Sequence, residues 1–163
     1  MVDFLWKATT CRGIELVQLI ISFAFLVLAV LSLRGMRWAY IAFVLLGLLY
    51  FPARVGFRLD PQPCELALNI PLAIHSLTNY GHIVRFALFF VMTWAQFRGR
   101  GWSVFTWTLL ATMAMGVLVE LAEGVSGRGH CRLRDLIPDA VGALLGQVIV
   151  FVWNSVRMRS RLD

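Results

Sequence analysis

The chain carries five apolar stretches that each approach the length needed to cross a lipid bilayer. A hydrocarbon core about 30 Å thick is spanned by about 20 apolar residues in a helix. Backbone polar groups in lipid must be paired within their own segment, so each stretch is expected to be helical. The stretches cover residues 14–33, 38–55, 80–97, 102–122 and 138–156. With 60% hydrophobic residues and a mean hydropathy of +0.77, the sequence predicts an all-α, polytopic membrane protein with a bundle of about five transmembrane helices.

The remaining residues leave no room for a soluble second domain, so we predict one transmembrane domain over residues 1–163. The first apolar stretch is too long for a signal-peptide core and lacks a small-residue cleavage site after it. We expect it to stay in place as a helix. The longest polar connection, 56–79, contains an apolar run at 66–74 that is broken by Pro71. We expect that run to lie in the membrane interface as a short amphipathic or re-entrant piece.

The two faces of such a bundle differ in charge. Five spans put the chain ends on opposite sides, and one side then holds the 34–37 turn, the 98–101 turn and the C-terminal tail. These segments carry seven arginines and one acid, Asp163, whereas the other side carries the remaining eight acids and all three histidines. Lysine and arginine counts alone are nearly equal on the two sides. Because short, purely basic turns suit the anionic cytoplasmic leaflet, we predict a cytoplasmic C-terminus and an outward acid-rich face.

Three cysteines, Cys11, Cys64 and Cys131, fall on the predicted outer face. One disulfide with one thiol left over and three unpaired thiols are both compatible with the sequence. No CxxC pair is present, so a zinc ribbon is not indicated. The net charge of +6 comes from arginines at helix ends, where they anchor spans at the headgroups. We therefore expect the lipid bilayer as a partner and expect no nucleic acid.

Four carboxylates bracket the polar loop inside the stretch 120–146: Glu120, Glu123, Asp135 and Asp139. Charged groups at a membrane rim are costly and need a reason. Glu120 and Glu123 share a helix face, and they form either rim ion pairs with nearby arginines or a polar pocket for a headgroup or a proton. Asp135 falls where an N-cap belongs, ahead of Pro138 in the first turn of the next helix. Asp139 lies deeper and should face the bundle.

Further polar groups complete this predicted cluster. His82 and Arg85 share one face at the start of the third span, and Arg128 and His130 lie in the loop itself. The histidines and carboxylates together could in principle offer oxygen-rich metal ligands, but no metal-binding spacing is present, and we predict neither a metal nor a cofactor. Gly124–Gly127 reads GxSG, and His82 is the only possible histidine base for Ser126. Because Ser126 is expected in a loop and not at the start of a helix, we do not favour a protease.

Gly142 and Gly146 form a GxxxG pattern in the fifth span. Such a pattern is typical of close helix packing, either within a bundle or between protomers.

At these residues the chain resembles the VanZ-like family of small membrane proteins. Glu120-Leu121, Asp135, Gly142 and Gly146 match the family's pattern at its spacing, and His82 followed by Phe86 is similar to its H-x-x-x-Y/F. Glu123 and Asp139 stand where the family has Gln and Asn, and Arg128 is one position early. The resemblance implies a multi-pass protein of the bacterial inner membrane, with an envelope role in glycopeptide (teicoplanin) resistance. It supplies no catalytic residues.

Three hypotheses follow. The first is a VanZ-like envelope protein whose polar cluster binds a lipid-linked or glycopeptide-related headgroup. The second is a small accessory or scaffold subunit, a homo-oligomer or part of a larger membrane complex. The third, which we favour least, is a membrane enzyme acting on a lipid-linked substrate, because the sequence holds no complete catalytic set.

Overall fold

The computed structural model describes residues 2–54, 60–67, 69–97, 101–126 and 131–160. Within these residues the chain is all-α, as the apolar stretches predict, with six α-helices and one short 3-10 turn. The elements are α1 (Val2–Leu33), α2 (Arg37–Arg54), α3 (Ile70–Ser76), α4 (Tyr80–Gln96), α5 (Trp102–Ser126), η1 (Leu133–Asp135) and α6 (Leu136–Arg159).

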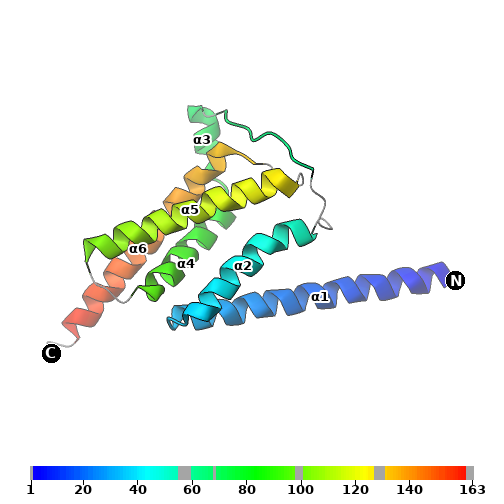
Figure 1. Ribbon diagram of the computed structural model, residues 1–163, viewed down its shortest axis with the longest axis horizontal. Helices are drawn as coiled ribbons and strands as arrows, with labels where there is room; N and C mark the ends of the chain where they lie inside the picture. Colours follow the sequence, from blue (N-terminus) through cyan, green and yellow to red (C-terminus); the bar gives the residue numbers. More distant parts are fainter. Residues whose placement is uncertain (1, 55–59, 68, 98–100, 127–130, 161–163) are drawn as a thin grey trace.

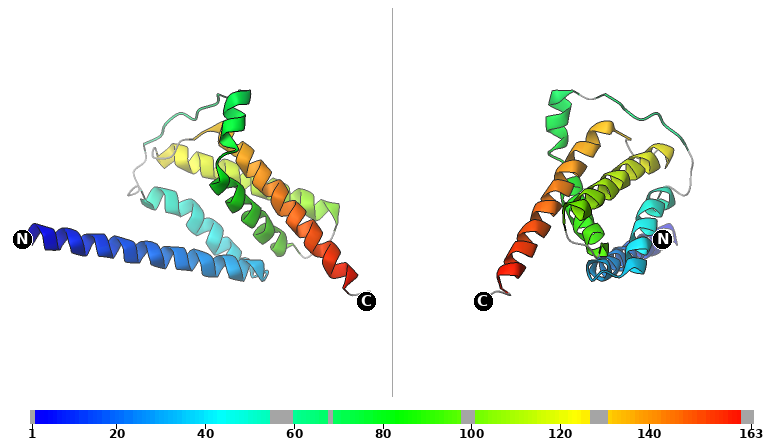
Figure 2. Two further views of the ribbon diagram at one scale, coloured as in Figure 1. Left: turned by 180° about the vertical axis from the view of Figure 1, so that it is seen from behind. Right: turned by 60° about the vertical axis from the view of Figure 1, so that its left-hand side comes forward.

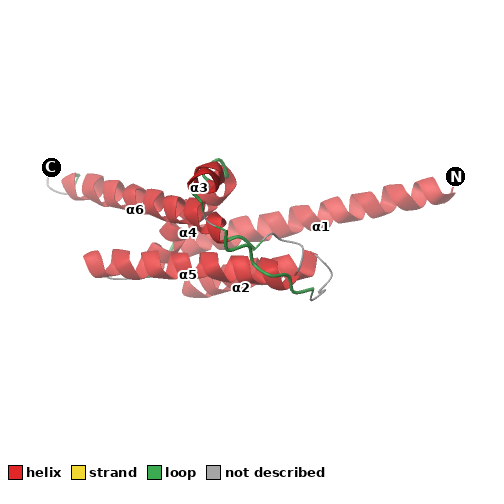
Figure 3. Ribbon diagram, turned by 90° about the horizontal axis from the view of Figure 1, so that it is seen from above, coloured by secondary structure: helices red, strands yellow, loops and turns green. Residues whose placement is uncertain are grey.

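Helix α4 is the centre of the bundle, and it packs against α1, α2, α5 and α6. Helices α5 and α6 also pack on each other, and α2 lies between α1 and α5 (Figure 1). Seen from above, α2 and α5 lie in one layer and α1 and α6 in another (Figure 3). In the left-hand view of Figure 2, the first part of α1 runs out beyond all the other helices.

The closest helix contact is between α4 and α6, and two glycines make it possible. A Cβ atom on Gly142 would overlap the carbonyl oxygen of Ile83, and one on Gly146 would lie 2.7 Å from the carbonyl oxygen of Ala87. Only a residue without a side chain lets two helix backbones approach so closely. The GxxxG pattern therefore lies inside this chain, against α4.

Aromatic and small side chains fill the space on both sides of α4. Phe90, Ala143 and Val150 form one buried cluster between α4 and α6. Ala29, Phe89 and Met92 form a second between α1 and α4. Tyr40 closes the second cluster, because its hydroxyl lies 3.0 Å from the hydroxyl of Thr93. The core thus follows α4 along its length.

The helices run past the predicted apolar stretches at several ends. Helix α1 begins at Val2 and not at residue 14, and α5 continues to Ser126. Polar residues end an apolar window, yet they do not end a helix. Helix α3 begins at Ile70, and Pro71 occupies its first turn, where a missing N–H costs nothing. The side chain of Asn69 caps α3 by accepting from the N–H of Leu72 at 2.9 Å.

Two segments of the described chain are long and apolar enough to cross a membrane, where the sequence predicts five. They are Trp102–Ser126 and Leu133–Arg157, each of 25 residues. The apolar parts of the first two helices, Val17–Leu33 and Arg37–Tyr50, are shorter. Helix α4 has 17 residues and includes His82 and Arg85, which reduces its apolar length.

Candidate functional site: a histidine–aspartate pair and a disulfide-linked roof

The first turns of α4 and α6 meet at a histidine–aspartate pair. Nδ1 of His82 lies 2.8 Å from Oδ1 of Asp139. The side chain of Asp139 is 1% exposed and that of His82 is 19% exposed. The helix contact at Gly142 explains the meeting, because Asp139 lies nearly one turn before Gly142, and His82 is adjacent to the Ile83 carbonyl that Gly142 contacts.

Helix α5 encloses the same carboxylate from the third side. A Cβ atom on Gly116 would lie 3.0 Å from Oδ2 of Asp139 and 3.4 Å from the ring of Phe86. The missing side chain at residue 116 therefore makes room for the carboxylate between three helices. A carboxylate removed from water is costly unless it is paired and hydrogen-bonded. The imidazole of His82 supplies that partner.

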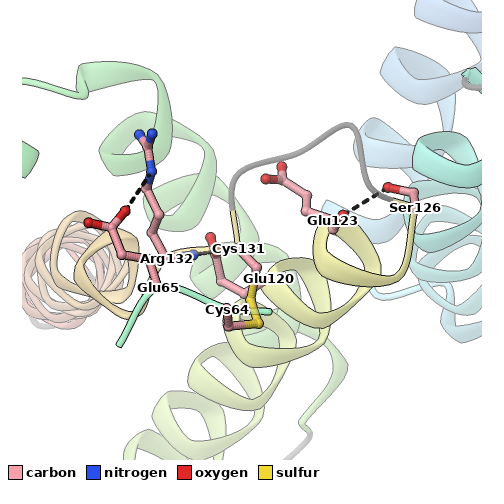
Figure 4. The surroundings of a disulfide bond; sticks show 7 residues. All are labelled: Cys64, Glu65, Glu120, Glu123, Ser126, Cys131 and Arg132. Carbon is pink, nitrogen blue, oxygen red and sulfur yellow. Dashed lines mark hydrogen bonds and ion pairs between the residues drawn. A yellow bond between two sulfur atoms is a disulfide. The ribbon is translucent and has the colours of Figure 1, made fainter. Parts of the chain in front are cut away.

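Glu120 is buried one turn beyond Gly116, and it holds a loop. Glu120 is only 5% exposed. Its Oε2 accepts a hydrogen bond from the N–H of Arg132 at 2.7 Å (Figure 4). A buried backbone N–H without a partner destabilises the fold by roughly 1–3 kcal/mol. Glu120 thus connects the end of α5 to the segment that leads into α6.

Two segments, 60–67 and 131–135, cover this end of the bundle, and we call them the roof. Cys64 and Cys131 form a disulfide across 67 residues of sequence, with their Cα atoms 4.7 Å apart (Figure 4). Beside it, the N–H of Glu65 donates to the carbonyl of Cys131 at 2.9 Å, and the N–H of Leu133 donates to the carbonyl of Glu65 at 3.0 Å. The roof is therefore held by one covalent bond and a short parallel backbone pairing.

The roof rests on α5 at Gly124. A Cβ atom on Gly124 would lie 3.3 Å from Sγ of Cys64 and 3.2 Å from Cβ of Cys131. The N–H of Gln62 donates to the carbonyl of Gly124 at 3.0 Å. The disulfide consequently packs directly on the helix that carries Glu120.

Ion pairs on the outside of the roof involve an acid that the sequence analysis did not select. The Glu65 carboxylate lies 3.2 Å from Nε of Arg132 and 3.5 Å from the guanidinium of Arg134. The sequence suggests these arginines as partners for Glu120 and Glu123, whereas Arg132 bonds Glu120 through its backbone. The sequence offers one signal that Glu65 and Arg132 are neighbours. Each directly follows a cysteine, Cys64 or Cys131, and both cysteines lie on the predicted outer face.

Six of the predicted site residues form one electrostatic cluster. Asp135 and Arg85 both act on His82 and on Asp139 through their charges. Glu123, Asp135 and Asp139 act in the same way on Glu120. Asp135 directly precedes α6, at the predicted capping position. The other two predicted residues, Arg128 and His130, lie outside the described residues.

Ser126 is the last residue of α5, and its hydroxyl donates to the carbonyl of Glu123 at 3.0 Å. Within the described chain, no three His, Cys, Asp or Glu side chains are grouped so that they could hold a metal ion.

Comparison of the sequence and the structure with protein-family models, curated proteins and solved structures gives no match. The function is therefore inferred from the geometry of the cluster.

Proposed function

We propose that the chain is an integral membrane protein of a cell envelope, with five transmembrane helices. Exposed apolar side chains on α1 and α2 support the extension from two candidate spans to four, and α4, which packs against all four of these helices, is the fifth. Leu19, Phe23 and Leu26 of α1 are 62–68% exposed and lie along one face, and Ile41, Leu45 and Leu49 of α2 are 54–56% exposed. Continuous apolar surfaces of this kind are unfavourable in water. A bilayer covers these apolar surfaces of α1 and α2.

The disulfide and the tail support an orientation. Disulfides persist in oxidising compartments and are rare in the cytosol, so the roof with Cys64 and Cys131 lies outside. The last turn of α6 carries Arg157 and Arg159, which suit the cytoplasmic side. Both observations favour an outer position for the cluster around His82 and Asp139, with a cytoplasmic C-terminus.

We infer that this outer cluster binds the headgroup of a lipid-linked or glycopeptide-related ligand. The observation that carries the inference is the His82–Asp139 pair, in which a carboxylate that is almost fully enclosed lies at the end of the bundle. Ionisable groups placed in a membrane bundle are associated with ligand sites and proton paths. The resemblance to VanZ-like proteins then gives the biological context, a contribution to glycopeptide (teicoplanin) resistance.

Expression in a teicoplanin-sensitive bacterium tests this function. The intact chain is expected to raise the inhibitory concentration of teicoplanin, and Asp139→Asn is expected to return it to the level of cells without the protein, because the charged partner of His82 is lost. Asp60→Asn is the matched control, since Asp60 is an exposed acid on the same side. Immunoblots of membranes establish equal protein levels. Full resistance with Asp139→Asn at equal levels contradicts the proposal.

A second candidate is an accessory subunit of a membrane complex, and the shape of α1 favours it. The first part of α1 extends beyond the other helices (Figure 1), whereas the GxxxG face is already occupied by α4. A partner would therefore dock along α1. Purification in mild detergent distinguishes the candidates: a partner in fixed ratio that is lost when residues 2–13 are deleted supports the subunit, and a single monodisperse species opposes it.

A further inference from the structure

The two ring nitrogens of His82 have different surroundings. When Asp139 is ionised, its carboxylate only accepts hydrogen bonds, and Nδ1 of His82 is then the donor in this pair. In the neutral ring the lone pair is then on Nε2. Within the described part of the chain Nε2 has no hydrogen-bond partner, and it is not among the buried polar atoms that lack one. Nε2 is therefore open to solvent or to a ligand.

The ring is also held in one orientation. It is nearly parallel to the ring of Phe86, one turn along α4, with 8° between the planes and 6.4 Å between the centroids. Asp139 bonds the ring at Nδ1, and Gly116 leaves room for the Asp139 carboxylate between the helices. A carboxylate that orients a histidine in this way also stabilises the imidazolium that forms when Nε2 accepts a proton.

We propose that His82 is a general base, with Asp139 as its positioning residue, for hydrolysis of an ester bond in an amphiphilic substrate. The inference rests on the proposed headgroup site and names the class of compound that the site takes. It also adds a reaction that the sequence alone does not favour.

The step needs only water and the ester. A water molecule transfers a proton to Nε2 of His82 as its oxygen forms a bond to the carbonyl carbon. The tetrahedral intermediate collapses, the bond from carbon to the alcohol oxygen breaks, and the alcohol leaves with the proton from the imidazolium. The products are a carboxylic acid and an alcohol, and Asp139 remains ionised throughout.

Arg85 is placed to stabilise the negative charge that develops on the carbonyl oxygen. It lies three residues after His82, on the same face of α4. Its guanidinium extends back along the helix, where a Cβ atom on Gly81 would lie 3.7 Å from it. A positive group at a developing oxyanion is one of the larger contributions to ester hydrolysis.

Exposed apolar side chains at the same level of α4 as His82, on another face of the helix, favour an amphiphilic substrate. Tyr80 is 72% exposed and Val84 is 66% exposed, on the first turns of α4. A compound whose apolar part lies in the lipid around α4 would bring its polar ester to the level of His82. A small, fully water-soluble ester would lack that contact.

Hydrolysis of p-nitrophenyl laurate, an ester with a long apolar chain, by the purified full-length protein in detergent micelles tests the proposal. His82→Gln is expected to lower kcat by about 100-fold or more, as expected for loss of a general base. His75→Gln is the matched control, because His75 is an exposed histidine on the neighbouring α3, and its rate is expected to equal that of the unmodified protein.

Asp139→Asn separates positioning from a merely structural role. We expect a lower kcat with KM little changed, and an altered pH–rate profile, because an amide does not stabilise the imidazolium. The charged groups that face the pair among the described residues are Arg85 of α4, Asp135 of η1 and Glu120 of α5. These stay in place in the Asn variant, so the change in profile reports on Asp139.

A chemical measurement covers the case in which a variant fails to fold. Diethyl pyrocarbonate modifies accessible neutral imidazole nitrogens. In the protein without substitutions, mass spectrometry then shows whether His82 or His75 carries the modification. Loss of hydrolysis is expected to follow modification of His82 and not of His75. Equal rates for His82→Gln and the unmodified protein, or hydrolysis that persists after His82 is modified, overturn the proposal. If His82→Gln abolishes hydrolysis while teicoplanin resistance is unchanged, the resistance proposal fails and the general base stands.

Discussion

Two acids in the described chain are buried, Glu120 and Asp139, and their partners give them different roles. Glu120 bonds a backbone N–H of the roof, so its contribution is to the architecture of the loop. Asp139 bonds a side chain that is itself partly exposed, so its contribution reaches the surface. Glu120 lies on α5, one turn beyond the Gly116 that contacts Asp139 of α6. Of the two carboxylates, only Asp139 is placed to influence a ligand through His82.

Substitution of Glu120 tests this division at the level of single residues. Glu120→Ala removes the acceptor for the N–H of Arg132, and we expect it to lower the free energy of unfolding by about 1–3 kcal/mol. Glu120→Gln keeps an acceptor oxygen at the same position and should cost less. Hydrogen exchange at the Arg132 amide is the direct measurement, with faster exchange expected for Ala than for Gln. Equal exchange in the two variants contradicts the assigned role.

The sequence predicted part of this residue-level picture. Asp139 was expected to face the bundle because it lies deeper in an apolar stretch than an N-cap does. The partner of Glu120 could not be predicted, because it is a backbone N–H 12 residues away and any loop residue could have supplied it. Pairing of Cys64 with Cys131 was equally open, since it depends on Gly124 leaving space for the sulfur atoms.

At the level of elements, the contact between α4 and α6 determines the site. These helices lie close enough at Gly142 and Gly146 for backbone atoms to be in contact with each other, and this closeness brings His82 to Asp139. The predicted helices at 80–97 and 138–156 follow from apolar runs that only a helix can satisfy in lipid. Which helices would be neighbours was not predictable, because a GxxxG pattern fits contacts inside a chain and between chains equally well.

Gly142→Ala is the matched test of this contact. The added methyl group would overlap the Ile83 carbonyl and lie 2.9 Å from Cβ of Phe86, so we expect a loss of about 1–3 kcal/mol of stability. Gly47→Ala is the control, because Gly47 has no atom within 4 Å of its Cβ position, and alanine there should favour the helix by up to about 1 kcal/mol. Thermal unfolding followed by circular dichroism in detergent compares the two. Equal stability of both variants contradicts the packing role.

At the level of the whole molecule, the charge asymmetry and the disulfide support the same orientation. The roof, with Glu65 and the cysteine pair, lies at the end of α5 and the start of α6. The arginines in the last turn of α6 lie at the opposite end of α6 (Figure 1). Lysine and arginine counts alone could not separate the faces, since the predicted outer face itself carries Lys7 and seven arginines. The contact of Arg132 and Arg134 with Glu65 offsets that charge locally.

Labelling with a membrane-impermeant maleimide tests the orientation. In a Cys11→Ser background, Thr78→Cys places a thiol at an exposed position between α3 and α4, and Ser160→Cys places one after α6. Thr78→Cys is expected to react in intact cells and Ser160→Cys only after the membrane is permeabilised. The reverse pattern would place the cluster in the cytoplasm.

The disulfide that packs on Gly124 also limits the order in which parts of the protein can form. Cys131 is made 67 residues after Cys64, so the crosslink cannot form before α5 has been synthesised. Until then segment 60–67 lacks its backbone partners in the roof, and Glu65 lacks both of its arginines. Segments 60–67 and 131–135 are thus joined covalently only after oxidation, so the disulfide-linked roof is completed only in a compartment that oxidises thiols.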